Sequence, residues 1–392
     1  MSETNTGVSG RYDFGLGSAQ EERARRLHHE SIIVDLVSQH VGGSNIYEHY
    51  PDDLKSDLRI RLKQSTGWAL LTDVEYWPYE MARCGKSHLI RDWYESSGLT
   101  CGTYGIGVHD GHDPTCIHLD AANAVFADLP WLQCVTTESE IRHAKRDGKV
   151  ALYAQWQPYI AWPRDLKAID VAYIKGLRSF MLTYNQMDHV GVGCTERVDA
   201  GLSMFGLEVV KHCNATGIVV DVSHCGHLTT LDACRHSTKP VTANHTAARG
   251  IHTHARGKND EALRAIADTG GVIGVVAAPP FLTSDPAPTV EHMLDHIDYI
   301  VELVGWRYVA IGTDWPQQAP LDVLKVTLEA GAKSIGFREE DHLDLTLRLD
   351  GFQDARDLPN ITRGLVKRGY SDEQIRGVLG ENVLRVFSEV WR

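Results

Sequence analysis

Three polar residues follow runs of β-branched and apolar residues: His224 after GIVVDVS, His245 after PVTAN and Asp314 after YVAIGT. Their imidazole nitrogens and carboxylate oxygens are ligands that zinc and similar ions accept in proteins. A single histidine in such a position is more often structural. Three such residues at the ends of predicted parallel strands favour a site, because the carboxyl ends of those strands meet at one rim. We therefore expect His224, His245 and Asp314 to bind a metal ion together.

Eight short runs rich in Val, Ile, Leu, Tyr and Thr predict the strands that carry these residues. The expected strands cover residues 31–35, 101–108, 150–156, 177–184, 217–223, 240–244, 271–278 and 308–313. Segments with helical spacing lie between them, including 202–216, 260–270 and 291–305, and each ends at or just before a glycine. This alternation predicts a (β/α)8 TIM barrel, with a doubly wound open sheet as the alternative architecture.

The domain organisation follows from the polar start of the chain and one long insertion. Residues 1–20 predict a loose N-terminal arm, and residues 21–392 a single barrel domain. Residues 36–100 form an insertion after the first strand, which we interpret as a lid or a dimer arm. Its aromatic residues either shape a pocket or simply pack the insertion down; they are Trp68, Tyr76, Trp77, Tyr79 and Trp93.

Two helices are expected outside the alternating part of the chain. Residues 21–30 have the charge and helix-forming content of a short leading helix. Residues 371–391 predict a closing helix, with Ser371 as its N-cap and Gln374 at the capping-box position.

Composition limits the class of partner. The chain has 392 residues with 43% hydrophobic content, which suits one large core. A net charge of -13 without a basic stripe disfavours nucleic acid and anionic membranes, so a small-molecule substrate is expected. No secretory signal and no apolar run of membrane-spanning length is evident, which predicts a cytoplasmic protein. The eight cysteines form no CxxC pair, so a zinc ribbon is not indicated.

Roughly residues 130–390 resemble the membrane (renal) dipeptidase family of the amidohydrolase superfamily. The resemblance rests on LRSFMLTYN, GLSMFGLEVVKHCNATGIVVDVSH, PVTANHTAARGIHTHARGKND and MLDHIDYIVELVGWRYVAIGTDW, and on the spacings of 21 and 69 residues that separate His224, His245 and Asp314. It implies a (β/α)8 barrel with two zinc ions, a bridging glutamate and a water between the metals.

The resemblance also implies roles for single residues, and a homodimer. His224 and His245 would bind one metal, while Asp314 would bind the other and act as acid and base. Arg256 would bind the terminal carboxylate of the substrate, a task that suits its planar fork. His296 matches a position that we interpret as supporting structure.

The chain departs from the family pattern at three strand ends. The first strand is followed by no His-x-Asp metal pair, the third delivers Gln157 where a bridging glutamate is expected, and the fourth delivers Tyr184 in place of a substrate-contacting histidine. Two adjacent zinc ions need several negative ligands to offset their repulsion. We therefore expect at most one zinc ion, bound through His224 and His245 with Asp314 or Gln157, or no ion.

Other residues could replace the lost ligands. Asp35, at the end of the first strand, is a further candidate ligand, although capping a turn is its alternative role. His109 and His112, in the loop after the second strand, are weaker candidates, because a loop rich in Gly, Asp and His is usually a hydrated turn.

Three functions stay open at this stage. The first is a metal-assisted hydrolase of a dipeptide or small carboxylated amide, with Arg256 anchoring the carboxylate and Asp314 taking a proton from water. The second is an enzyme redirected to a non-hydrolytic reaction, a lyase, isomerase or amide-forming step, in which Tyr184, Gln157 and Arg256 orient an amino-acid-like substrate. The third is a non-catalytic binder, which the retained histidines and aspartate disfavour.

Overall fold

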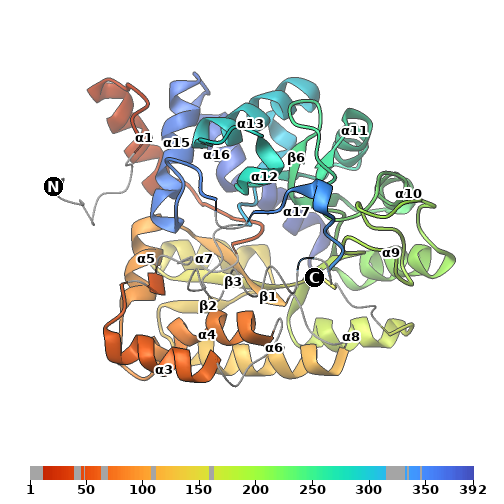
Figure 1. Cartoon of the computed structure of the whole chain (residues 1–392), viewed down its shortest axis with the longest axis horizontal. Helices are drawn as coiled ribbons and strands as arrows, with labels where there is room; N and C mark the ends of the chain where they lie inside the picture. Colours follow the sequence, from red (N-terminus) through yellow and green to blue (C-terminus); the bar gives the residue numbers. More distant parts are fainter. Residues whose placement is uncertain are drawn as a thin grey trace.

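A parallel sheet lies at the centre of the molecule, and helices surround it (Figure 1). The computed structural model describes residues 12–38, 46–47, 49–62, 69–106, 112–158, 163–314, 332, 335–344 and 347–392. The strands are β1 Cys101–Ile106, β2 Leu132–Cys134, β3 Val150–Trp156, β4 Leu177–Met181, β5 Val219–Asp221, β6 Val241–Ala248, β7 Gly257–Lys258, β8 Ile273–Val275 and β9 Val309–Ile311.

The helices that follow or precede these strands cover the outside of the sheet. They are α1 Ser18–Glu30, α3 Asp52–Leu62, α4 Ala69–Arg83, α5 Leu89–Ser97, α6 His112–Ala127, α7 Glu138–Arg146, α8 Leu166–Ile174, α9 Met204–Thr216, α10 His227–His236, α11 Asp260–Asp268, α12 Pro279–Leu282, α13 Val290–Val304, α15 Leu358–Lys367, α16 Asp372–Arg376 and α17 Asn382–Val390. Short 3-10 turns are η1 Trp306–Tyr308, η2 Glu339–Asp341 and η3 Ala355–Asp357, and η4 Gly377–Glu381 is a π-helical turn.

The sheet closes into a barrel. Its strands run in the order β1-β3-β4-β5-β6-β8-β9, with β2 paired to β3 and β7 paired to β6. The predicted first strand is reduced to two parallel bridges, Val34 with Cys101 and Asp35 with Ile311, and these join the two edges of the sheet. The predicted (β/α)8 TIM-barrel fold is therefore confirmed, and the open doubly wound alternative is wrong because both edges are paired.

The barrel strands are buried on both faces, as their continuous apolar runs predict. Every residue of β3, β4, β5 and β6 is buried. Helices α9 and α13 end at Gly217 and Gly305, each with φ 97°, a backbone conformation that glycine adopts without steric cost. The glycines therefore mark helix ends where the sequence predicts them.

The N-terminal segment packs against the domain from a lower residue number than predicted. Helix α1 begins at Ser18, and Phe14 before it is buried. The Arg363 side chain of α15 donates a hydrogen bond to the Tyr12 carbonyl at 2.7 Å. A loose arm therefore does not extend over residues 12–20, and the rest of that prediction falls on residues 1–11, outside the described part of the chain.

The insertion predicted over residues 36–100 contains α3, α4 and α5. Trp77, Tyr79 and Trp93 are buried in it, and Tyr79 Oη lies 2.7 Å from Tyr94 Oη. These aromatic residues pack the insertion down, which was one of the two predicted roles, while Trp68 lies outside the described residues. The role of the insertion as a lid or a dimer arm stays a prediction.

The predicted closing helix contains a π-helical turn. Ser371 caps its start, because Ser371 Oγ accepts from Gln374 N at 3.2 Å and Gln374 Oε1 accepts from Ser371 N at 2.8 Å. The helix then widens at η4, where the Leu379 carbonyl accepts from Val34 N at 2.8 Å. A Cβ at Gly380 would lie 2.3 Å from the Ile32 carbonyl, so the π turn rests directly on the first strand segment.

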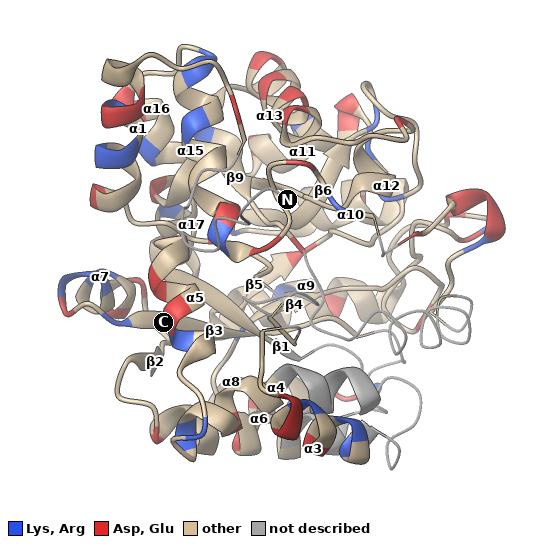
Figure 2. Cartoon of the chain, turned by 60° about the vertical axis from the view of Figure 1, so that its left-hand side comes forward, with Lys and Arg blue, Asp and Glu red and all other residues tan. Residues whose placement is uncertain are grey.

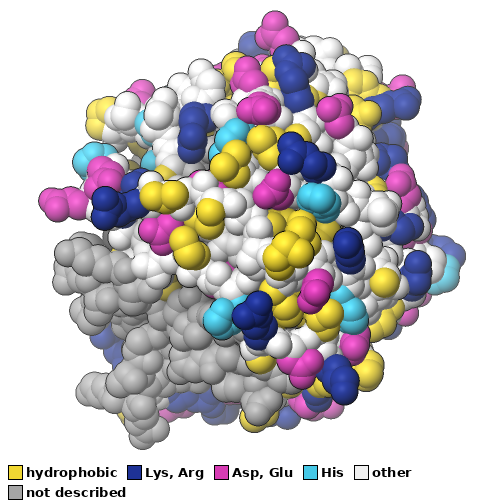
Figure 3. Space-filling model, turned by 90° about the vertical axis from the view of Figure 1, so that its right-hand side faces the viewer, with side chains coloured by type: hydrophobic (Ala, Val, Ile, Leu, Met, Phe, Trp, Pro, Cys, Tyr) yellow, Lys and Arg dark blue, Asp and Glu magenta, His cyan; other side chains and the backbone are white. Residues whose placement is uncertain are grey.

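Charged residues lie mainly on the surrounding helices and loops, and the central strands carry few of them (Figure 2). On the face shown in Figure 3, acidic, basic and apolar side chains are interspersed among the described residues. No described helix has both the length and the apolar character needed to cross a membrane.

Candidate active site at the carboxyl ends of the strands

The structure brings His224, His245 and Asp314 together. His224 follows β5, Asp314 follows β9, and His245 lies inside β6, where the pairing with β8 shifts register between Ala243 and Thr246. The Nε2 atoms of His224 and His245 are 3.0 Å apart, and Asp314 Oδ2 lies 3.8 Å from His245 Nε2. The predicted juxtaposition is therefore present, although β6 continues past the residue at which we expected it to end.

Burial sets the protonation of these groups. The pKa of His224 and that of His245 are lowered well below the usual value, first by burial and then by the charge of Arg256. Both rings are therefore neutral at neutral pH and keep a nitrogen lone pair. Burial raises the pKa of the Asp314 carboxyl to about 7, and Arg256 opposes this rise. Asp314 has φ 47°, a left-handed conformation that is uncommon for a residue with a side chain.

Tyr184 lies against His224. Its ring is stacked on the imidazole with centroids 3.9 Å apart and planes at 23°. Burial raises the pKa of the Tyr184 hydroxyl, so this residue is neutral and can donate a hydrogen bond at neutral pH. The structure places the predicted substrate-contacting residue at the site, and contact with substrate stays a prediction.

Arg256 braces the two histidine segments in this structure. Its Nη1 donates to the Ser223 carbonyl at 2.6 Å and its Nη2 to the His245 carbonyl at 3.1 Å. Its Nε is buried without a hydrogen-bond partner among the described residues, and its guanidinium lies 5.5 Å from the centroid of the Phe281 ring. The N–H group at Nε thus has no hydrogen-bond partner among the described residues. The predicted contact of Arg256 with a substrate carboxylate stays a prediction.

Lys258 is a site-supporting residue that the sequence reasoning missed. Its buried Nζ donates to the Cys225 carbonyl at 2.6 Å and to Thr230 Oγ1 at 3.1 Å. Together with Arg256, it holds the carbonyls of the residues on either side of His224. It was missed because β7, which carries it, has only two residues and no periodic pattern.

Asp35 occupies the turn-capping role. Its Oδ1 accepts from Thr313 N at 2.8 Å and from Val37 N at 3.2 Å, and its Oδ2 accepts from Thr313 Oγ1 at 2.6 Å. Its carboxylate thus fixes the residue before Asp314 to the first strand segment. Burial raises the pKa of Asp35 to about 6, and the hydrogen bonds from Thr313 oppose the rise.

The amides that end the third strand are buried, with polar atoms left over. Gln157 Nε2 and Gln155 Oε1 have no hydrogen-bond partner among the described residues, and Gln155 Nε2 lies 3.4 Å from Thr103 Oγ1. The role of Gln157 as a ligand or substrate contact stays a prediction. His109 falls outside the described residues, and His112 begins α6 with a side chain outside that part of the chain.

The described residues do not complete a zinc site. Among them, no three His, Cys, Asp or Glu side chains are arranged to hold a metal ion. Besides the two imidazole nitrogens, one carboxylate oxygen lies nearby, and it approaches His245 alone. A protein zinc site has at least three ligands. The described part of the chain therefore shows two imidazoles and one carboxylate near each other but no complete ligand set for a metal ion.

Two other features lie apart from this site. His296 supports structure as predicted, because its Nδ1 accepts from Ala248 N at 2.9 Å and its Nε2 donates to the Leu282 carbonyl at 3.0 Å.

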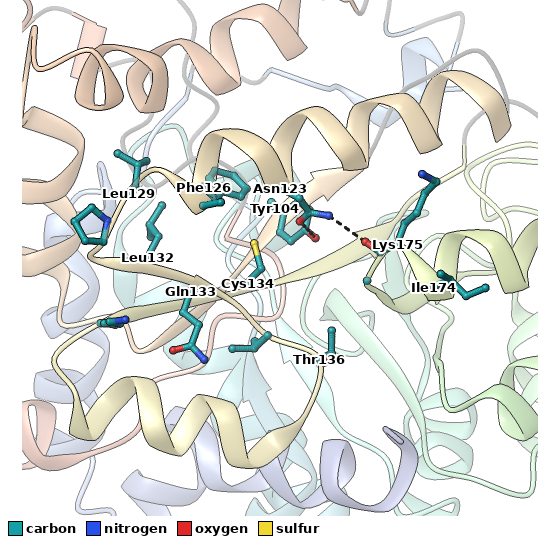
Figure 4. A pocket seen from close by; sticks show the side chains of 15 residues that line it. Tyr104, Asn123, Phe126, Leu129, Leu132, Gln133, Cys134, Thr136, Ile174 and Lys175 are labelled. Carbon is teal, nitrogen blue, oxygen red and sulfur yellow. Dashed lines mark hydrogen bonds between the residues drawn. The ribbon is translucent and has the colours of Figure 1, made fainter.

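A cavity of about 470 Å³ is bordered by the loops before β3 and β4, at the amino ends of the strands (Figure 4). Its Tyr104 hydroxyl donates to Asn123 Oδ1 at 2.9 Å, so these polar groups are already paired.

Three solved structures share the fold over most of their length. An amidohydrolase from Pseudomonas aeruginosa is 28% identical with a TM-score of 0.74, covering 94% of this chain and 99% of that one. The probable dipeptidase PvdM from the same organism is 18% identical with a TM-score of 0.68, covering 96% and 99%. A metallopeptidase from Rhodobacter sphaeroides, liganded with a phosphinate mimic of L-Ala-D-Ala, is 18% identical with a TM-score of 0.68, covering 92% and 100%.

The sequence also matches a family model over most of its length. The model is that of the membrane dipeptidases, peptidase family M19, and it covers residues 99–328 and 322–392. These ranges include the strand ends that carry His224, His245 and Asp314. The chain therefore belongs to the membrane dipeptidase family and is a dipeptidase-like hydrolase.

Proposed function

We propose that this protein hydrolyses a dipeptide or a small carboxylated amide at the rim formed by His224, His245 and Asp314, with at most one zinc ion. The observation that carries the proposal is the 3.0 Å approach of the two Nε2 atoms, with the Asp314 carboxylate 3.8 Å from the second. Two neutral imidazoles and a carboxyl at one rim are groups that can serve as acid, base or metal ligand in amide hydrolysis.

The charge around the site favours a substrate with a carboxylate. Arg256 and Lys258 are both buried beside the histidines, and both lower the pKa of His245 through their charge. Buried positive charge attracts an anionic group, although the Asp314 and Asp221 carboxyls nearby offset part of this charge. The phosphinate mimic of a dipeptide bound to the Rhodobacter relative supports the same substrate class.

Asp314 is suited to move the proton of the reaction. A carboxyl with a pKa of about 7 is half ionised near neutral pH, which suits a general base. In the proposed step, the Asp314 carboxylate takes a proton from water as the water oxygen bonds to the amide carbon. It then gives that proton to the amine nitrogen as the carbon–nitrogen bond breaks, so a carboxylic acid and an amine leave.

The test combines metal analysis with a panel of dipeptides. We expect at most one zinc ion per chain, no zinc in His224→Ala, and cleavage of at least one dipeptide by the wild type but not by His224→Ala. His212→Ala is the control, because His212 pairs with Asp170 away from the rim at 2.7 Å. Two zinc ions per chain would contradict the reduced site. No cleavage by zinc-supplied wild type would contradict the hydrolase.

We also propose a cytoplasmic homodimer. The family resemblance supports the dimer, and the insertion with α3, α4 and α5 is the candidate interface. Sedimentation of the purified chain gives its mass in solution, and fractionation of cells that express it gives its location. A monomer, or a protein found outside the cytoplasm, would contradict this proposal.

A further inference from the structure

Asn185 connects His224 to a segment that is distant in sequence. This residue follows β4, is fully buried, and places its side-chain amide between two partners. Its Oδ1 lies 2.7 Å from His224 Nδ1, and its Nδ2 donates to the Ile335 carbonyl at 2.9 Å. None of the sequence patterns singled out Asn185 or residue 335.

The second contact fixes which way the amide points. A backbone carbonyl can only accept a hydrogen bond, so the atom of Asn185 that faces Ile335 must be the NH2 group. The Cys194 thiol, 3.5 Å from Oδ1, agrees with this orientation because a thiol can donate to oxygen. The atom that faces His224 is therefore an acceptor.

An acceptor at this position determines the tautomer of His224. Its Nδ1 must carry the hydrogen, so in the neutral ring the lone pair lies on Nε2. That Nε2 is the atom that faces His245 Nε2 at 3.0 Å. The other tautomer would place a hydrogen there and remove the lone pair from the rim.

The segment 335–341 is seated tightly on Asn185. Gly336 has φ 84°, and a Cβ on it would lie 2.5 Å from Gln186 Cγ and 3.1 Å from Asn185 Cβ. Thr195 Oγ1 lies within hydrogen-bond distance of the Gly336 carbonyl, at 2.7 Å, and of the Asn185 carbonyl, at 2.9 Å. A side chain at Gly336 would therefore both strain the backbone and push the segment away from Asn185.

The same segment is also tied to the Arg256 side of the rim. The Asp341 carbonyl accepts from His254 Nε2 at 2.9 Å, and His254 Nδ1 accepts from Arg256 N at 3.0 Å. The Phe337 ring stacks on the Phe281 ring with centroids 6.2 Å apart. The segment thus spans both sides of the histidine pair and is anchored at each.

We infer that Asn185 is a positioning residue that holds His224 in the Nδ1–H tautomer, and that the segment 335–341 fixes the amide orientation on which this depends. Hydrogen bonds of this kind to a ligating or catalytic histidine set its tautomer and ring orientation. The tautomer of His224 can be measured whether or not the protein is a hydrolase. Its importance for turnover rests on the proposed function.

The direct test is the tautomer itself. Long-range proton–nitrogen correlation spectra of protein labelled with 15N-histidine distinguish Nδ1–H from Nε2–H rings at neutral pH without any substrate. The His224 signal is assigned by its loss in His224→Gln. We expect Nδ1–H in the wild type and in Asn185→Asp, which keeps an acceptor oxygen. Nε2–H in the wild type would overturn the inference.

Asn185→Leu and Gly336→Ala test the two halves of the link. Both should shift His224 toward Nε2–H, and Asn185→Leu should lower kcat/KM about 10- to 100-fold. Asn360→Leu is the control, because Asn360 is equally buried and donates to the Gly351 carbonyl at 2.8 Å. An unchanged tautomer in folded Asn185→Leu would overturn the role of Asn185. A shifted tautomer in a chain that cleaves no dipeptide would contradict the proposed function alone.

Discussion

The two sides of the barrel rim differ in what their polar side chains bond to. On the first-strand side, which comprises residues 34–38 with β1 and β3, the short polar side chains of Asp35, Ser38 and Thr103 bond to backbone and to one another, whereas Gln155 in β3 keeps its Oε1 without a partner among the described residues. Ser38 Oγ accepts from Thr103 N at 2.8 Å, and Thr103 Oγ1 accepts from Ser38 N at 3.2 Å. On the histidine side, which comprises the ends of β4, β5, β6 and β9, the Nε2 atoms of His224 and His245 face each other.

This difference shows how the groups that could bind a ligand come to lie mainly on one side of a buried rim. Buried polar groups need hydrogen-bond partners, so a strand end without ligand side chains must supply its own. Asp35 does so for the first-strand side by accepting from Thr313 and Val37. On the histidine side, His245 Nδ1 has no partner among the described residues, and the Nε2 atoms of the two rings face each other at the rim.

Removing the carboxylate of the histidine side should have the largest effect. We expect Asp314→Asn to lower kcat/KM for a dipeptide about 10²- to 10⁴-fold, because the amide cannot take a proton from water. In the wild type, kcat/KM should rise with pH through about 7, since burial raises the pKa of Asp314 to that value and only the ionised form is a base.

The measurement is a pH–rate profile of the two proteins, with Asp170→Asn as a control that changes an aspartate outside the rim. The rise near pH 7 should vanish in Asp314→Asn. Full activity in that variant, or a wild-type profile that is flat from pH 5 to pH 8, would remove Asp314 from the catalytic step.

Removing the carboxylate of the first-strand side should affect stability more than chemistry. Asp35→Asn replaces an acceptor of three hydrogen bonds with an amide, and we expect the free energy of unfolding to fall by about 1–3 kcal/mol. Because burial raises the folded-state pKa of Asp35 to about 6, the wild type loses stability as the pH rises from about 4 to about 6, and the variant should lack this contribution.

Urea unfolding at several pH values measures both effects, and zinc content is determined on the same samples. Zinc per chain should be equal in Asp35→Asn and the wild type. A folded variant that loses its zinc would make Asp35 a ligand and would abolish the contrast between the two sides.

The smallest effect is expected at Gln155. Its Oε1 is buried without a partner among the described residues, so Gln155→Met removes an unsatisfied acceptor and one long hydrogen bond, from Nε2 to Thr103 Oγ1 at 3.4 Å, while keeping a similar shape. The melting temperature should stay the same or rise slightly, and dipeptide cleavage should not change. A large loss of activity at an unchanged melting temperature would show that Oε1 faces a bound ligand, so that the first-strand side takes part.

Local patterns predicted the barrel and the histidine side well. The apolar runs, the helix-ending glycines and the Ser371 cap depend on neighbours in sequence, and His224 and Asp314 follow strands as expected. His245 was placed after its strand, but it lies within β6 at a change of register. Such a change depends on the pairing with β8 and leaves no local signal.

The residues that the sequence did not reveal act through contacts between distant segments. Asn185 and Ile335 are separated by 150 positions, and the Lys258 amine and Cys225 carbonyl by 33. Asp35 was considered as a ligand, yet its partner Thr313 is 278 positions away and holds it in a turn. A polar residue at a strand end can cap, brace or bind, and only its neighbours in space separate these roles.

The buried amine of Lys258 gives the protein a built-in reporter of local opening. Amine-modifying reagents require solvent access and an uncharged nitrogen, and Lys258 Nζ is enclosed by Cys225 and Thr230. Burial lowers the pKa of this amine, so a larger fraction of it is uncharged than in an exposed lysine. The rate at which Lys258 becomes modified, read by mass spectrometry, therefore follows how often its amine separates from Cys225 and Thr230.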